Sequence, residues 1–275
     1  MGLRVNTNIS SIAAQRQLAA VSNRLSDNYQ RLASGMRIAS AADDPAGLGI
    51  SERMRAQLKS LAQASRNGQD GVSLVQTAEG ALNEANANLT RMRELAIAAA
   101  NGTLNTGDRA TLNAEFTALT EEIDRLATST QFNGVSLLNN AGATIDIQIG
   151  SEKGEVISLA LADTTLAGLN LTGSSFDITT VTNATNLLST IDAAIDTLTT
   201  TRGALGASQN RLQTAIRSLG NAEENLSAAE SRIRDVDVAL ETADLTRNTI
   251  LQQAAVSVLS QANLQPQIAL SLLQG

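Results

Sequence analysis

Asp43 and Asp44 are adjacent carboxylates, and paired carboxylates could hold a metal ion. The sequence supplies no third carboxylate close by to complete such a site. Pro45 follows directly, and proline is favoured in the first turn of a helix, where the Asp before it can accept hydrogen bonds from free backbone N–H groups. The pattern therefore predicts the start of a helix here, and we predict no metal, cofactor or catalytic residue elsewhere.

The composition argues against catalysis and against two classes of partner. The chain of 275 residues contains no His and no Cys, so the commonest general base, the usual zinc ligands and the thiol nucleophile are missing. We expect a protein that is not an enzyme. A net charge of −7 argues against nucleic acid, and the lack of an apolar run of about 20 residues argues against membrane insertion.

The N-terminal stretch has the periodicity of a helix over residues 6–33. Apolar residues recur at steps of four and three, which is the pattern of a coiled-coil seam, and Asn28 is a polar interruption in it. Gly35 is a plausible stop for this helix. The apolar seam residues are Ala14, Leu18, Val21, Leu25 and Leu32.

The middle of the chain predicts an antiparallel helical pair followed by a hairpin. Residues 46–100 form one helix with an unbroken three–four ladder, and a short polar link leads to a second helix over residues 108–129. Alternating apolar residues then predict a β-hairpin over residues 145–161, and residues 162–183 read as an irregular, variable loop. The ladder residues are Val75, Ala78, Leu82, Ala85, Leu89, Met92, Ala96 and Ala99.

The C-terminal stretch continues one helical register over residues 184–263, which predicts a rod of roughly 120 Å. From residue 248 onward it carries no charge, yet it is rich in Gln, Ser and Asn. Its apolar stripe must meet the N-terminal helix, another molecule, or both. The stripe consists of Ile250, Leu251, Ala254, Ala255, Val258, Leu259 and Ala262.

These patterns together predict a fold that is mainly α, a long antiparallel helical coiled coil or bundle with a small β-hairpin region. Aromatic residues are 1 % of the chain, so the interior must be aliphatic. Two paired helices leave their outer apolar faces open, and exposed apolar surface of that extent usually marks an interface. Copies that stack head to tail without closing would give a helical filament.

At this point the chain resembles the bacterial flagellins. The resemblance runs through LASGMRIASAADDPAGLGISERMRAQ and LAQASRNGQDGVSLVQTAEGALNEANANLTRMRELA near one end, and through SRIRDVDVALETADLTRN and ILQQAAVSVLSQANLQPQIALSLL near the other. It covers about two-thirds of the chain, and the short central part implies a short form without large outer domains. It implies that residues 1–42 and 236–275 are the two halves of an inner coiled-coil core domain, and that residues 43–235 form an outer core domain.

The resemblance also implies a function and partners. The protein would be the structural subunit of the flagellar filament for swimming motility, exported unfolded to the cell exterior, with terminal helices that fold on assembly. The absence of an N-terminal signal peptide agrees with that route. The expected partners are other subunits, the flagellar export apparatus, a flagellin chaperone, the filament cap protein and the hook–filament junction protein. The seam and stripe residues named above would carry the assembly contacts.

A further implication concerns Arg91, Leu95 and Glu115. They match the family positions that contact a neighbouring protofilament and that Toll-like receptor 5 recognises, although Thr90 stands where the family commonly has Gln. We favour the protofilament contact as their purpose.

Two alternatives stay open. A hook–filament junction protein shares flagellin-like ends, although the unbroken match favours flagellin itself. A cytoplasmic signalling coiled coil belongs to a different class, but it would not explain the hairpin.

Overall fold

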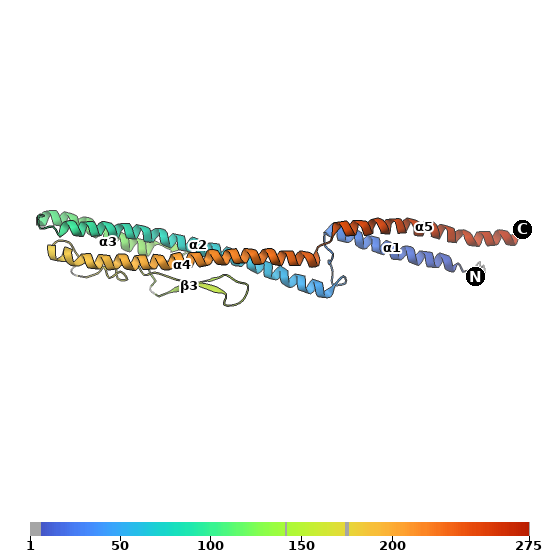
Figure 1. The fold of residues 1–275 in the computed structure, drawn as a ribbon, viewed down its shortest axis with the longest axis horizontal. Coiled ribbons are helices and arrows are strands. Elements are labelled where there is room, and N and C mark those ends of the chain that lie inside the picture. Colours follow the sequence, from blue (N-terminus) through green and yellow to red (C-terminus); the bar gives the residue numbers. More distant parts are fainter. Residues whose placement is uncertain (1–6, 141, 174–175, 275) are drawn as a thin grey trace. The chain divides into compact units, whose positions relative to one another are not determined.

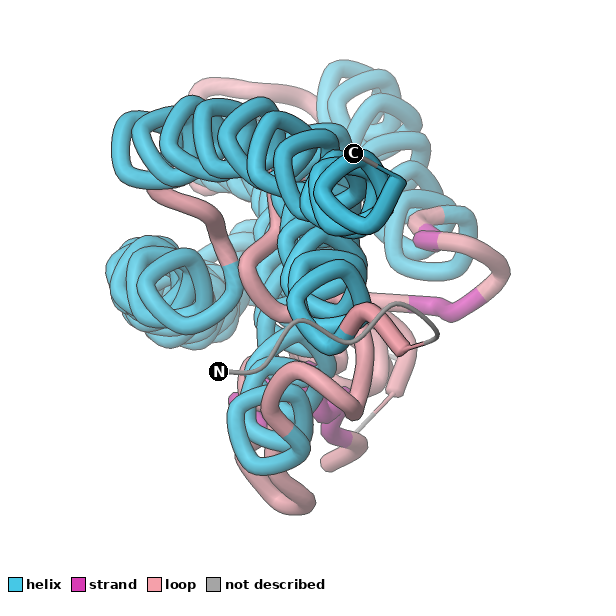
Figure 2. Tube along the Cα trace, turned by 90° about the vertical axis from the view of Figure 1, so that its right-hand side faces the viewer, coloured by secondary structure: helices cyan, strands magenta, loops and turns pink. Residues whose placement is uncertain are grey.

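The computed structural model describes residues 7–140, 142–173 and 176–274, with side chains placed as far as residue 264. Helices account for most of this part of the chain and the strands are short (Figure 2), so the predicted mainly α fold is confirmed. The chain divides into a terminal unit, residues 1–56 with 225–275, and a central unit, residues 57–224. The elements are α1 (Ile9–Ser34), α2 (Pro45–Ala99), α3 (Thr106–Ser129), β1 (Gln131–Phe132), β2 (Val135–Ser136), β3 (Thr144–Gln148), β4 (Val156–Ala160), α4 (Val181–Arg234) and α5 (Val238–Gln274).

The central unit is a bundle in which α3 and α4 both run antiparallel to α2 (Figure 1). Ion pairs mark these neighbours: Arg91 of α2 binds Glu115 of α3 at 2.8 Å, and Arg93 of α2 binds Asp192 of α4 at 2.6 Å. The predicted antiparallel pair of α2 and α3 is therefore confirmed. The helix α3 begins two residues earlier than predicted, because Asn105 and Asp108 form a reciprocal capping box.

The core of the central unit is aliphatic, as predicted. Every residue of the α2 ladder is at most 3 % exposed. Phe116 of α3 and Ile191 of α4 are also buried. The rings of Phe116 and Phe176 lie 5.3 Å apart. Because α3 and α4 pack against the ladder of α2, each of the three helices buries one continuous stripe.

The predicted hairpin is confirmed by β3 and β4, which pair antiparallel with Ile145 opposite Leu159 and Ile147 opposite Ile157. Gly71 of α2 lets it approach closely, since a Cβ there would lie 3.3 Å from Ile147 Cγ1. The smaller hairpin of β1 and β2 was not predicted. Its turn places Asn133 and Gly134 at φ of 49° and 80°, values that Asn-Gly pairs adopt readily.

The terminal unit contains α1 and α5, which pack antiparallel. Asn8 caps α1 by accepting from the N–H of Ser11, and Gly35 ends it in the left-handed region at φ 70°, as predicted. Asp44 caps α2, with its Oδ1 accepting from the N–H groups of Ala46 and Gly47, so the predicted helix start is confirmed. No helix among the described residues is both long and apolar enough to cross a membrane.

The prediction of one helix over residues 184–263 is wrong, because α4 ends at Arg234 and α5 begins at Val238. Asp237 caps the new helix through hydrogen bonds from the N–H groups of Ala239 and Leu240 to its Oδ1. The backbone freed at the break pairs with the connector after α1. Val236 donates to the Gly35 carbonyl at 3.0 Å, and Arg37 donates to the Arg234 carbonyl at 2.7 Å.

Candidate assembly surface

The terminal unit has a seam formed by one narrow stripe of α1 and one of α5. On α1, Ser11, Ala14, Val21 and Asn28 are buried, and Leu18, Leu25 and Leu32 are half-buried, in the register that the sequence predicts. The residues alternate steps of three and four, as in coiled coils. The facing stripe of α5 consists of Glu241, Leu245, Asn248, Gln252, Ala255, Leu259 and Ala262, all buried or half-buried.

Two polar layers interrupt this seam. In the first, the amide nitrogen of Asn28 donates to Glu241 Oε1, and Asn248 Nδ2 donates to Asn28 Oδ1 at 2.7 Å. In the second, Asn8 Nδ2 donates to the Ala262 carbonyl at 2.7 Å, and Ser11 Oγ donates to an Asn263 side-chain oxygen at 2.8 Å. The seam therefore combines aliphatic contacts with directional hydrogen bonds.

The rest of α5 presents apolar side chains to solvent. Ile250 is 60 % exposed, Val256 52 % and Val258 59 %. At about 100° per residue these side chains leave the helix in different directions. A helix that is apolar on all sides is normally buried on all sides. Further exposed apolar residues of the terminal unit are Ile9, Ile12, Tyr29, Ile50, Val238, Leu240, Leu251 and Leu264.

The structure divides the predicted stripe of α5 between these two environments. Ala255, Leu259 and Ala262 belong to the seam, whereas Ile250, Leu251, Ala254 and Val258 are exposed. The seam is rotated around α5 away from the centre of the predicted apolar stripe, because Glu241, Asn248 and Gln252 occupy positions in the seam. An apolar count alone misses such positions, but the heptad spacing of these polar residues could have found them.

A small hollow of about 200 Å³ lies along the flank of the seam. Its walls are almost entirely apolar. A hollow of this size and character could receive an aliphatic side chain. It is lined by Ala14, Gln17 and Val21 of α1 and by Leu251, Ala254, Ala255 and Val258 of α5.

A cluster around Arg234 fastens the connector of the terminal unit. The Arg234 guanidinium donates to Glu52 Oε1 at 2.8 Å and to Met36 Sδ at 3.2 Å. Hydrogen bonds from Arg234 and Arg55 hold the pKa of Glu52 below its ordinary value. Asp43 accepts from the backbone N–H groups of residues 39 and 40, and the bonds from Ser40, backbone first, lower its pKa in the same way.

The central unit contains the other predicted contact residues. Arg91 is exposed and its guanidinium binds both Glu115 Oε1 and Glu94 Oε2, at 2.8 and 2.9 Å. These bonds, that of Glu115 first, raise the pKa of Arg91. Leu95 is only 3 % exposed because it packs into the bundle core, so its side chain offers no surface to a partner. Thr90 is exposed.

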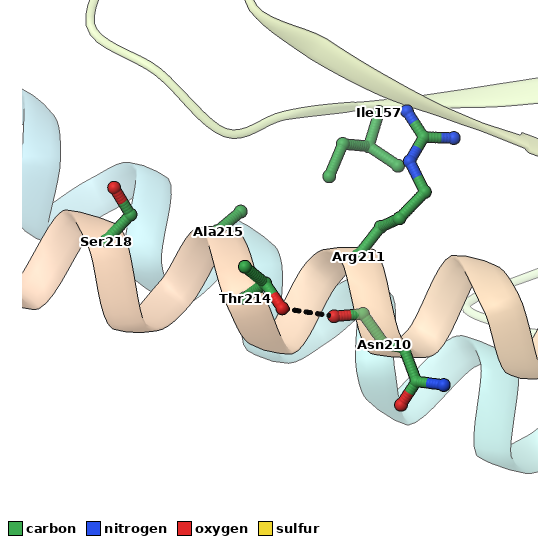
Figure 3. Close-up of a pocket in the computed structure, with 6 residues that line it drawn as sticks. All are labelled: Ile157, Asn210, Arg211, Thr214, Ala215 and Ser218. Atoms are coloured by element: carbon green, nitrogen blue, oxygen red, sulfur yellow. Dashed lines mark hydrogen bonds between the residues drawn. The ribbon is translucent and has the colours of Figure 1, made fainter.

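An open hollow of about 470 Å³ lies between β4 and α4 (Figure 3). Arg211 extends from α4 toward Ile157, while Thr214 donates to the carbonyl of Asn210 on its own helix. No group of three or more His, Cys, Asp or Glu side chains that could hold a metal occurs among the residues with described positions. Of the six residues that line the hollow, Arg211 is the charged one.

Comparisons with known proteins point to one family. Residues 5–143 match the family model described as the bacterial flagellin N-terminal helical region, and residues 188–273 match that of the C-terminal helical region. A flagellin of Halalkalibacterium halodurans is 47 % identical over 98 % of this chain and 99 % of its own length. A flagellin of Bacillus subtilis is 40 % identical over 99 % of this chain and 100 % of its own length. The crystal structure of Bacillus cereus flagellin is 34 % identical, with a TM-score of 0.51 over 60 % of this chain and 94 % of that one.

Proposed function

This chain belongs to the bacterial flagellin family, and we infer that it is a structural subunit that polymerises into the flagellar filament outside the cell and serves swimming motility. Its role is structural rather than catalytic. One observation carries the inference: the apolar side chains of α5 extend beyond its seam with α1 on several sides. One neighbouring helix cannot cover them, whereas copies of the same chain can.

We propose that the chain consists of two domains with different positions in the filament. Residues 1–42 and 236–275 form the inner coiled-coil core domain, and residues 43–235 form the outer core domain. The break between α4 and α5 and the connector after α1 support these boundaries, since both lie where the helices end. The assembly residues are those of the seam and the exposed stripe, with Leu251 and Val258 directed toward other copies.

We propose that α1 and α5 fold fully only on assembly. Ordering a residue costs about 1–2 kcal/mol of backbone entropy, and a single narrow seam buries little surface to offset it. Before assembly the subunit would leave the cell unfolded through the flagellar export apparatus, with a flagellin chaperone on its apolar C-terminal segment. The filament cap protein would then guide its folding, and the hook–filament junction protein would bind the first subunits.

The exposed pair of Arg91 and Glu115 fits a contact with a neighbouring protofilament. Arg91 is held by two carboxylates, which fixes its side chain at the surface. We propose that Toll-like receptor 5 recognises the same patch secondarily, with Leu95 supporting it from the core. Arg91→Ala should then weaken both filament stability and receptor activation. If Arg91→Ala changes neither filament stability nor receptor activation, the patch serves neither role.

Seeded polymerisation tests the main proposal. Purified full-length chain added to filament fragments should extend them, as seen by negative-stain electron microscopy. A chain that lacks residues 248–275 should not extend them, while its central unit keeps its thermal unfolding transition. Long filaments from the truncated chain would contradict the proposal. Growth that stops at short caps would favour a junction protein instead.

A further inference from the structure

The seam between α1 and α5 needs a feature that selects the correct pairing. Its aliphatic residues, such as Ala14, Val21 and Leu259, can pack against almost any apolar helix face. In a filament, many copies of both helices would be close together, and each has apolar side chains beyond the seam. The hydrophobic effect is non-directional, so aliphatic contacts alone would allow α5 to pair with another α5 or to slide along α1.

The polar layer of Asn28, Glu241 and Asn248 is directional. A carboxylate can only accept, so Glu241 requires the amide N–H of Asn28, which in turn leaves Asn28 Oδ1 to accept from Asn248. Asn28 and Glu241 are each only 7 % exposed. All three groups are therefore satisfied together in one arrangement of the two helices.

The second polar layer fixes the same arrangement from the other end of α1. Ser11 and Asn263 meet there, and the spacing along each helix allows both layers to form in only one antiparallel register. A parallel pairing, or a slide by one heptad, would disrupt these bonds. The Val236–Gly35 backbone bond holds the two helix ends of one chain together, but it does not constrain helices of different copies.

We propose that the layer of Asn28, Glu241 and Asn248 prevents incorrect pairing of the terminal helices between copies. Two α5 helices that paired with each other would bury Glu241 with no amide donor from α1, and that penalty disfavours the complex. A single polar residue in a coiled-coil seam is known to specify register and orientation at a cost in stability. The inference rests on the proposed assembly of copies through α1 and α5.

Cysteine cross-linking can test this selection, because the natural chain has no cysteine. Gln252→Cys lies midway along the α5 seam, so two α5 helices paired in either direction would bring the two thiols together. Ser11→Cys with Asn263→Cys reports the correct pairing, because these side chains meet in the seam. Each reporter is placed in the natural background and in a background with Asn28→Leu, Glu241→Leu and Asn248→Leu. Both are then oxidised during seeded polymerisation, when the proposed function has α1 and α5 fold.

In the background with the three leucine substitutions, we expect the yield of covalent dimers of the Gln252→Cys reporter to rise on the order of tenfold. The yield of the intrachain disulfide in the Ser11→Cys, Asn263→Cys reporter should fall in the same background. Thr249→Leu is the matched control, because Thr249 is half-buried on α5 and its hydroxyl bonds its own helix. It should change neither yield. Equal dimer yields with and without the polar layer would overturn the proposal. Filament formation, scored separately by microscopy, keeps this failure distinct from failure of the proposed function.

Discussion

The central unit and the terminal unit use the same helical repeat but bury it to different extents. In the central unit, α3, α4 and the β3–β4 hairpin enclose the ladder of α2, and side chains such as Leu82 and Leu89 have no exposed surface. In the terminal unit, α1 packs against α5, and Val258 of α5 stays 59 % exposed. A three–four repeat therefore predicts a helix face that must be covered, while the number of neighbouring elements decides whether the chain covers it alone.

Val258→Asp should have the largest effect, because it would place a charge where we expect other copies to pack. Leaving a charge buried without a partner costs about 3–5 kcal/mol, which raises the critical concentration for polymerisation on the order of a hundredfold or more. The unfolding midpoint of the central unit should not change. Sedimentation of polymer at increasing subunit concentrations measures the effect. Val181→Asp, at an exposed valine of the central unit, should assemble normally. If both variants lose polymer equally, the exposed apolar residues of the two units do not differ in their role in assembly.

Leu89→Ala should have its main effect on the stability of the central unit. Leu89 has no exposed surface, so its truncation leaves a cavity and lowers the free energy of unfolding by about 2–5 kcal/mol. Leu264→Ala is the matched change at a residue that is 45 % exposed, and it should cost no more than about 0.5 kcal/mol in the monomer. Denaturant unfolding of the unpolymerised chain compares the two. Similar losses would show that the two units are equally closed.

Gly68→Ala should report how tightly the elements around α2 pack. A Cβ at Gly68 would lie 2.9 Å from Ile216 Cγ1 and 3.3 Å from Ile149 Cδ1, so we expect a loss of about 1–3 kcal/mol from overpacking. Gly80→Ala meets nothing within 4 Å and should stabilise the same helix by about 0.5–1 kcal/mol. Thermal unfolding measures both. Stabilisation by both variants would mean that this face of α2 is open.

The smallest effect concerns pH in the terminal unit. Hydrogen bonds from Arg234 and Arg55 lower the pKa of Glu52 in the folded state. Its contribution to stability is therefore present above its unfolded pKa of about 4.5 and is lost as pH falls through the lower folded pKa. Arg234→Gln should move the pKa of Glu52 back toward 4.5, as measured by NMR titration. An unchanged pKa would show that the Arg234 cluster does not hold the connector in solution.

Local signals in the sequence predicted much of this fold. The ladder from Val75 to Ala99 specified α2, and the alternation around Ile147 and Ile157 specified the hairpin. Asp44 before Pro45 specified a helix start, because capping depends on residues that are neighbours in the chain. These features need no knowledge of distant contacts.

Other features depend on contacts between distant segments. The break between α4 and α5 lies within an unbroken helical register, and it is stabilised by backbone bonds from Val236 to Gly35 and from Arg37 to Arg234. The face of α5 that meets α1 includes polar residues, since Glu241 and Asn248 occupy seam positions and hydrogen-bond to Asn28 of α1. Leu95 shows the limit of resemblance, since matching a family position does not reveal that its side chain is buried.

Circular dichroism of monomer and filament can show whether other copies complete the terminal unit. The helices α1 and α5 contain 26 and 37 residues, so their folding on assembly should add a large helical signal. A dilute monomer should therefore show clearly lower helicity than the same chain in filaments, and a variant lacking residues 248–275 should show no gain when filament seeds are added. Equal helicity in monomer and filament would mean that α1 and α5 are already folded without other copies.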